Sequence, residues 1–173
     1  MEKGNDLDAL EVALNNEHTE REFYLAHARK TGNPLGKSMF LMIADDELEH
    51  YERIRELHEK LKGAGKWPES LPLSVKQTKV RALIDSLNAT GQASESTGDD
   101  LEAIAVATAF EAKGAEFYAK LRDGSSDAKQ KAFFALLAGI EREHYLALKD
   151  AEDYLKDPGG WLRRTERGSL DGG

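Results

Sequence analysis

The sequence contains no cysteine, which excludes disulfide bonds, thiolate nucleophiles and Cys-ligated zinc, iron or iron–sulfur centres. Its longest apolar run, Ala132 to Ile140, spans nine residues, whereas a membrane-spanning helix needs roughly 20. The 24 Lys and Arg are outnumbered by 32 Asp and Glu, a balance that argues against binding to nucleic acid. The acidic, amphipathic segment 1–14 is unlike a secretory signal or a transit peptide. We therefore expect a cytoplasmic protein that binds neither nucleic acid nor membranes.

Helical periodicity fills most of the 173 residues, a length that is typical of one domain. The pattern predicts four long helices, over residues 5–30, 34–61, 99–121 and 126–155. Asn5 is the predicted cap of the first helix, and Pro34 suits the first position of the second. Residues 157–160 (DPGG) should end the fourth helix. Residues 1–157 are thus expected to form one bundle domain and residues 158–173 a C-terminal tail, in which Trp161 docks on the bundle.

The connection between the second and third helices, residues 62–98, is unusually long for a compact domain. It contains one short amphipathic segment, Ser74 to Leu87, with a capping box formed by Ser74 and Gln77. A helix of about 25 residues is roughly 37 Å long, and this connection is long enough to run that distance. The sequence therefore predicts an all-α, ferritin-like four-helix bundle: a tight helix pair, a long crossover and a second tight pair.

The two predicted helix pairs repeat each other without a gap. Residues 17–24 (EHTEREFY) match residues 111–118 (EAKGAEFY), and residues 47–51 (ELEHY) match residues 141–145 (EREHY). Every matched position lies 94 residues from its counterpart. A duplicated two-helix unit, packed about a pseudo-twofold axis, explains this register most simply.

Four of the repeated residues are glutamates that interrupt helix faces that are otherwise apolar. Buried and unpaired, these four glutamates would cost several kcal/mol each. Two divalent cations would balance four carboxylates and two neutral imidazoles, and the i, i+3 spacing puts Glu and His on one helix face. Such an oxygen-rich set suits iron or manganese, with zinc as an alternative. The six candidate ligands are Glu17, Glu47, His50, Glu111, Glu141 and His144.

One Glu from each of two helices, with Glu-x-x-His from each of the other two, is the pattern of ferritin-like di-iron proteins. Residues 5–155 resemble the rubrerythrin branch, through Glu17-xxx-Arg21-xx-Tyr24, residues 46–50 (DELEH) and residues 141–144 (EREH). The resemblance implies that the six candidates are catalytic ligands of two iron ions per bundle. Tyr24 and Tyr118 would then lie beside the ligands, or serve simply as core aromatics.

Two features depart from the rubrerythrin pattern. Rubrerythrins usually carry a rubredoxin domain that supplies electrons, and this sequence has no cysteine. An external donor, such as a separate rubredoxin, is therefore implied. They also usually carry an extra glutamate three residues after the ligand in the third helix, where this sequence has Gly114. The repeat counterpart of Gly114 is Glu20, which becomes a candidate seventh ligand; the alternative is a surface position.

The resemblance implies an enzyme that reduces hydrogen peroxide, and dioxygen more slowly, at a di-iron centre. A ferroxidase or another iron-handling protein is the first alternative, because the six-residue set is symmetric. A structural bundle that holds zinc or manganese is the second. A homodimer is expected, partly from the family and partly because a long crossover allows two-helix units to exchange between chains.

Overall fold

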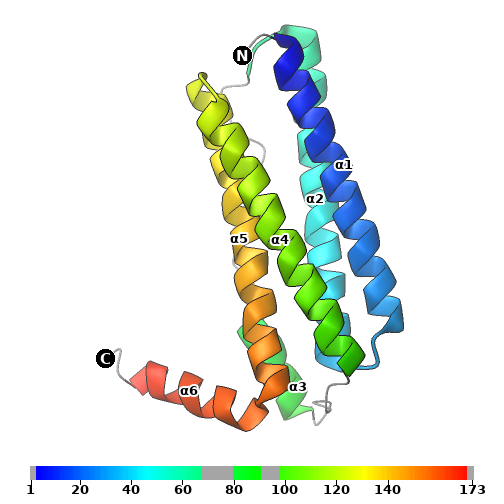
Figure 1. The fold of residues 1–173 in the computed structure, drawn as a ribbon, viewed down its shortest axis with the longest axis vertical. Helices are drawn as coiled ribbons and strands as arrows, with labels where there is room; N and C mark the ends of the chain where they lie inside the picture. The colour runs from blue at the N-terminus through cyan, green and yellow to red at the C-terminus, as the bar shows by residue number, and fades with distance from the viewer. Residues whose placement is uncertain (1–2, 68–79, 91–97, 171–173) are drawn as a thin grey trace.

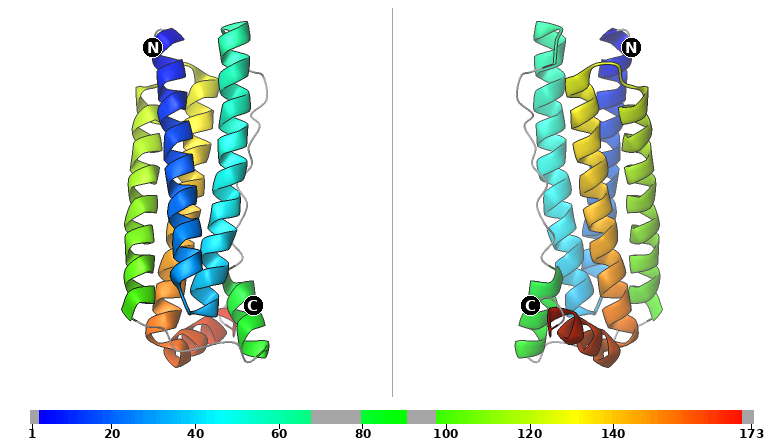
Figure 2. Two further views of the ribbon diagram at one scale, coloured as in Figure 1. Left: turned by 90° about the vertical axis from the view of Figure 1, so that its right-hand side faces the viewer. Right: turned by 90° about the vertical axis from the view of Figure 1, so that its left-hand side faces the viewer.

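Four long helices run side by side along the molecule, and two shorter helices lie at one end of it (Figures 1 and 2). The computed structural model describes residues 3–67, 80–90 and 98–170, with no strand among them. The long helices are α1 (Lys3–Lys30), α2 (Pro34–Ala64), α4 (Gly98–Gly124) and α5 (Ala128–Lys156). The short ones are α3 (Val80–Ala89) and α6 (Pro158–Leu170). The predicted all-α, ferritin-like bundle is confirmed.

The helix boundaries follow from local chemistry. The side chain of Asn33 caps α2 by accepting hydrogen bonds from two backbone N–H groups, and Pro34 follows it at the first helical position. Asp127 caps α5 in the same way. Gly65 ends α2 with a positive φ of 64°, a conformation that glycine adopts without strain. The predicted cap at Asn5 is wrong, because α1 already begins at Lys3.

The crossover joins opposite ends of the bundle, as predicted. In Figure 1, α2 ends near the top of the molecule, whereas α3 and the start of α4 lie at the bottom, so α2 and α4 run in the same direction. α1 packs mainly on α2, and α4 mainly on α5. The predicted short helix of the crossover exists as α3, but the capping box at Ser74 and Gln77 lies outside the described residues. Of the helices that the structure describes, none combines the length and apolar character that crossing a bilayer requires.

Within the predicted C-terminal tail, residues 158–170 form a helix. α5 does end at Lys156, but Pro158 then occupies the start of α6, where its fixed φ suits a new helix. The predicted docking of Trp161 is confirmed: its side chain is buried, and its Nε1 donates a hydrogen bond of 2.6 Å to Asp150. Its ring meets that of Tyr154 edge-on. The start of α6 is thus fastened to the end of α5, and the rest of the helix projects sideways from it (Figure 1).

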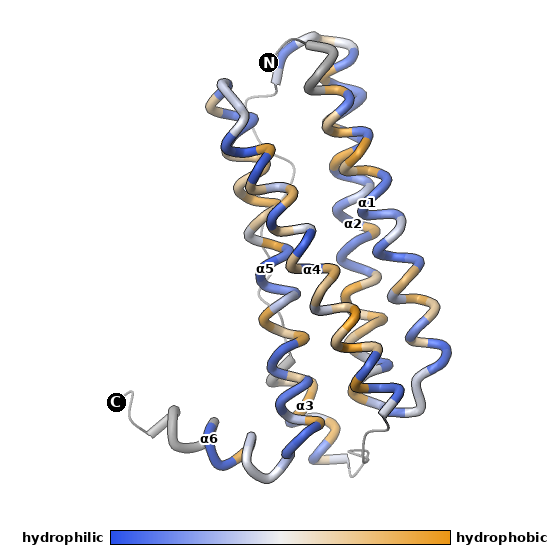
Figure 3. The backbone as a smooth tube through the Cα atoms, viewed as in Figure 1, coloured by the Kyte–Doolittle hydropathy of each residue, from blue (hydrophilic) through white to orange (hydrophobic). Residues whose placement is uncertain are grey.

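Two apolar clusters fill the interior, one toward each end. The cluster nearer α3 and α6 includes Phe40, Ile104 and Trp161, and the opposite one includes Leu57 and Phe133. Polar and apolar residues alternate along each long helix (Figure 3), which is the pattern of helices with one buried face. Between the clusters, at mid-length, the buried residues are carboxylates and imidazoles. The two apolar clusters thereby shield a polar centre from water.

Candidate metal centre

The structure brings the six predicted ligands together in the middle of the bundle. α1 and α4 each contribute one glutamate, and α2 and α5 each contribute a Glu-x-x-His pair on one helix face. Every one of the six side chains is buried, with residue exposures between 0% and 6%. The residues are Glu17, Glu47, His50, Glu111, Glu141 and His144.

The candidate ligand atoms fall into two overlapping groups, each within 4.8 Å. The first group is formed by Glu17, Glu47, His50 and Glu141, and the second by Glu47, Glu111 and His144. Glu47 belongs to both groups, so its two oxygens are placed to serve two neighbouring cations. Two adjacent positions with one shared carboxylate fit a dinuclear centre.

Both histidines present Nδ1 to the carboxylates. In the first group, His50 Nδ1 lies 3.0 Å from a Glu47 oxygen and 3.2 Å from a Glu17 oxygen. In the second group, His144 Nδ1 lies 3.1 Å from the other Glu47 oxygen and 3.5 Å from a Glu111 oxygen. The two imidazole rings lie 5.8 Å apart. Each position therefore has one imidazole nitrogen among carboxylate oxygens.

The pKa shifts in the centre reveal an excess of negative charge. Burial, reinforced by the charge of Glu47, raises the pKa of Glu17 to about 7. Burial and neighbouring carboxylates also raise the pKa of Glu141 well above its usual value. Burial alone would lower the pKa of His50, but its carboxylate neighbours raise it to about 10. The carboxylates outnumber the two histidines, so without a metal some of them take up protons, and a bound cation would stabilise their ionised form.

Glu47 shows the opposite pKa shift from Glu17 and Glu141. Burial acts to raise its pKa, but the charge of the nearby His144, together with the hydrogen bond and charge of His50, outweighs burial and holds the pKa below its usual value. Glu47 therefore stays ionised in the middle of the cluster. A carboxylate that is ionised and shared by both groups is suited to bridge two cations.

The unpaired atoms in the cluster also fit a metal. Among the described residues, six buried atoms of this cluster make no hydrogen bond. Such atoms are costly unless something binds them, and all six are of types that ligate metals. Four carboxylates with one imidazole for each position suit iron or manganese. The six atoms are Glu20 Oε2, Glu47 Oε1, Glu111 Oε2, both carboxylate oxygens of Glu141 and His144 Nδ1.

The two predicted tyrosines contact the glutamates across the repeat. Tyr24 of α1 donates a hydrogen bond to Glu111 of α4, and Tyr118 of α4 donates one to Glu17 of α1. Both rings are buried. Burial and the adjacent carboxylates raise the pKa of both hydroxyl groups well above the usual value, so both stay protonated donors. Each tyrosine also belongs to an apolar cluster. Both tyrosines therefore lie beside the candidate ligands and are core aromatics at the same time.

Glu20 lies inside the bundle and not on its surface. Its residue exposure is only 4%. Burial, followed by the charges of Glu47, Glu17 and Glu111, raises the pKa of its carboxyl group well above the usual value. The cluster thus contains five buried glutamates.

Sequence reasoning missed the contribution of Asp46 to the centre, and it noted Gly114 without foreseeing the contact of this residue with Glu141. Asp46 precedes Glu47, and its Oδ2 lies 3.5 Å from Nε2 of His144. A carboxylate on the outer nitrogen orients a metal-binding histidine and raises its basicity. Gly114 packs against Glu141, because a Cβ at this position would lie 2.6 Å from a Glu141 oxygen. The detectable signal was a difference between the repeats: the counterparts of Asp46 and Gly114 are Ile140 and Glu20.

Comparisons with known proteins agree with this geometry. A family model described as rubrerythrin matches residues 8–152. Among solved structures, a hypothetical protein from Pyrococcus furiosus is similar, with 25% sequence identity and a TM-score of 0.59. The match covers 88% of this chain and 90% of that one. No curated protein matches the sequence.

Proposed function

Because the chain belongs to the rubrerythrin family, we propose that its bundle holds two iron ions and reduces hydrogen peroxide, and dioxygen more slowly, to water. The observation that carries this proposal is the pair of overlapping ligand groups that share Glu47. Iron held by these residues would supply the redox chemistry: reduction of one peroxide to two water molecules takes two electrons, one per Fe(II), and two protons, and reduction of dioxygen takes two further electrons from the external donor and two further protons.

The residues of the chain hold the reacting centre and keep water away from it. Glu17 and His50 belong to one position, Glu111 and His144 to the other, and Glu47 joins the two. The hydroxyl groups of Tyr24 and Tyr118 fix the orientation of Glu111 and Glu17 through one oxygen each. The other oxygen of each glutamate remains directed toward the histidines.

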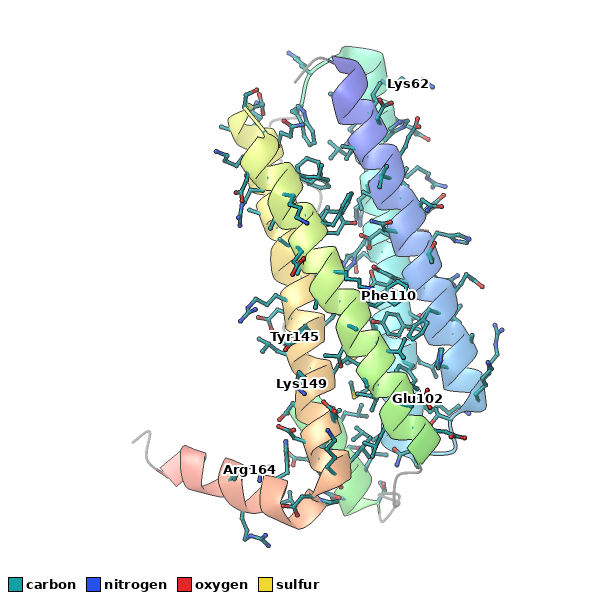
Figure 4. All side chains as sticks on the ribbon, in the orientation of Figure 1. Lys62, Glu102, Phe110, Tyr145, Lys149 and Arg164 are labelled. Atoms are coloured by element: carbon teal, nitrogen blue, oxygen red, sulfur yellow. The ribbon has the colours of Figure 1, made fainter. Side chains whose placement is uncertain are left out.

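The apolar clusters on both sides of the centre favour a small oxidant over a large substrate. Phe110 of α4, labelled in Figure 4, stacks on Phe23 of α1 with ring centroids 5.3 Å apart. Buried residues of all four long helices fill the clusters above and below the ligands. Electrons come from a donor outside this bundle, because a sequence without cysteine offers no rubredoxin-type or iron–sulfur site.

Stopped-flow absorbance tests the proposal directly. The metal-free chain is loaded anaerobically with two Fe(II) and mixed either with one equivalent of peroxide or with air-saturated buffer. We expect faster oxidation by peroxide, followed by reduction back to the diferrous state by a chemical donor. Zn(II)-loaded protein is the matched control and should consume no oxidant. Binding of two metals with no oxidation by either reagent would contradict the proposal and favour a structural bundle.

An iron-handling role is the second candidate, favoured by Gly114. This residue leaves the α4 side of the centre without the extra glutamate that rubrerythrins usually have, so that the six main ligands are symmetric. A ferroxidase would react rapidly with dioxygen and continue to turn over when excess Fe(II) is added. Column sizing separates the candidates further, since a large shell supports storage and a dimer does not.

A further inference from the structure

The two halves of the centre differ at two pairs of repeat positions. Glu20 of α1 corresponds to Gly114 of α4, and Asp46 of α2 corresponds to Ile140 of α5. In both pairs the carboxylate belongs to the first half, and its counterpart has no charge. The six main ligands are symmetric, so these two pairs decide whether the two metal positions are equivalent.

On the α4 side, Glu141 occupies the space that a side chain at position 114 would need. A Cβ there would lie 2.6 Å from Glu141 Oε2 and 3.1 Å from its Cδ. Glu141 also joins the first ligand group, with Glu17, Glu47 and His50, which makes that group complete with four donors. The glycine thus allows a carboxylate of α5 to serve the first position.

Within the described part of the chain, the second group has three donors, Glu47, Glu111 and His144. Glu20 lies beside this group: its side chain is buried, and its Oε2 has no hydrogen-bond partner among the described residues. Its carboxyl group interacts electrostatically with all three donors, and also with Glu17 and Glu141 of the first group, which already has four donors. A buried, unpaired carboxylate oxygen next to an incomplete ligand group indicates a missing cation contact.

We propose that Glu20 is a ligand of the second metal, the one held by Glu47, Glu111 and His144. This inference rests on the metal centre proposed above and assigns to it a seventh protein ligand. The first half of the repeat thereby supplies the carboxylate that the second half lacks at Gly114.

Asp46 acts at the same position. Its carboxylate lies against Nε2 of His144, which leaves Nδ1 to face the metal ligands. The repeat counterpart of His144 is His50, and the counterpart of Asp46 is the apolar Ile140. With Glu20 the second position has three carboxylates and one imidazole, as many as the first. Its imidazole is the more basic of the two, which strengthens binding of a cation. The two metals are consequently unequal, with the tighter one beside His144.

Co(II) titration of the metal-free full-length chain tests this assignment without any turnover. Calorimetry gives the two affinities, and visible absorbance reports the ligands of each Co(II). We expect two Co(II) to bind with unequal affinity. Glu20→Gln should weaken the tighter position by about tenfold or more, change its absorption band and leave the other position unaltered. Glu22→Gln, at an exposed position of the same helix, is the matched control and should behave as wild type.

Histidine variants establish which metal Glu20 serves. In a His50→Ala background, Glu20→Gln should keep its full effect on the remaining position. In a His144→Ala background, it should add little, because that position is already weakened. The reverse pattern would overturn the assignment to the second metal. Glu20→Asp, which keeps the charge on a shorter side chain, should fall between Gln and wild type, and circular dichroism checks that each variant is helical.

The outcomes separate this inference from the proposed function. If Glu20→Gln binds two Co(II) with wild-type affinities and spectrum, the role of Glu20 is wrong and the di-metal centre stands. If the wild-type chain binds no Co(II) or Fe(II) at all, the proposed function fails with it.

Discussion

The two halves of the bundle, α1 with α2 and α4 with α5, keep the same ligands but surround them differently. Both halves carry a Glu, a Tyr and a Glu-x-x-His pair at positions 94 residues apart. On the outer face of α4 and α5, Ala112, Ala115 and Ala119 line a shallow groove of about 440 Å³, together with Tyr145 (labelled in Figure 4).

The counterparts of these three alanines on α1 are His18, Arg21 and Leu25, so the outer face of the first half carries larger side chains. The two halves therefore share their candidate metal ligands and differ in the residues around those ligands. The ligand positions make the two halves chemically alike, whereas the neighbouring positions make them distinguishable by substitution.

The largest expected effect compares the two glutamates of the Glu-x-x-His pairs. Glu47 belongs to both ligand groups, and Glu141 belongs to the first alone. We expect Glu47→Gln to lose both metals and with them peroxide reduction, and Glu141→Gln to keep the metal beside His144. Elemental analysis after Fe(II) or Co(II) loading and desalting measures the metal content. Equal losses in the two variants would show that the halves share their metals more evenly than the structure indicates.

The tyrosine pair tests whether the halves are equivalent in stability. Tyr24→Phe and Tyr118→Phe each remove one hydrogen bond that crosses from one half to a buried glutamate of the other. An unsatisfied buried acceptor costs about 1–3 kcal/mol, so both variants should lower the free energy of unfolding of the metal-free chain by that amount. Urea denaturation provides the measurement.

Similar losses for the two tyrosines would confirm that the repeat is symmetric here, and a difference of more than about 1 kcal/mol would contradict it. Tyr51→Phe is a suitable control, because Tyr51 is only partly buried and lies outside both ligand groups. It should leave the free energy of unfolding almost unchanged.

Gly114→Ala sharpens the comparison at the position where the repeats diverge. The added Cβ would press on the end of the Glu141 side chain, so we expect the carboxylate to move and the first metal to bind about tenfold more weakly. The fold should lose little, since alanine also favours the helix. Metal titration and urea denaturation separate the two effects.

Gly63→Ala in α2 is the matched control for Gly114→Ala. A Cβ at Gly63 meets nothing within 4 Å. This variant should gain up to about 1 kcal/mol of stability from helix propensity and keep both metal affinities. If Gly114→Ala bound both metals as wild type does, the position of the Glu141 carboxylate would not depend on the absence of a side chain at position 114.

The sequence alone was sufficient to predict the bundle, because its strongest signals are local or repeated. Pro34 and Asp127 mark helix starts through their own backbone chemistry. The repeat at 94 residues predicted that both Glu-x-x-His pairs lie on the inward faces of their helices. Residues 157–160 correctly predicted the end of α5, but they did not predict that Pro158 begins another helix, and the structure shows the start of α6 held to the bundle by the buried Trp161.

The missed parts of the centre depend on contacts between helices. The sequence could not show that Asp46 of α2 faces His144 of α5, because that contact joins two halves far apart in the chain. The burial of Glu20 likewise depends on the packing of four helices, and an isolated Glu is exposed far more often than not. Differences between repeats at otherwise conserved faces were the available clue.

The smallest expected effect compares repeat counterparts near the bundle end. Glu152 of α5 accepts hydrogen bonds from Lys149 and Lys156, whereas its counterpart, His58 of α2, lies 3.4 Å from Glu11. The hydrogen bonds from Lys149 and then Lys156 hold the pKa of Glu152 below its usual value. A carboxyl group with a lowered pKa in the folded state adds stability above its unfolded pKa, and this contribution is lost as the pH falls through the folded value.

Glu152→Gln should therefore lower the free energy of unfolding by less than about 1 kcal/mol at pH 7, since the lysines are largely exposed. The difference from wild type should shrink as the pH falls below about 4.5, where the unfolded carboxyl group takes up its proton. Urea denaturation at pH 7 and at successively lower pH measures it, with Glu59→Gln on the exposed surface of α2 as the control. If the difference in the free energy of unfolding grew toward low pH, the pKa of Glu152 would not be lowered, and its hydrogen bonds to the two lysines would not stabilise the fold.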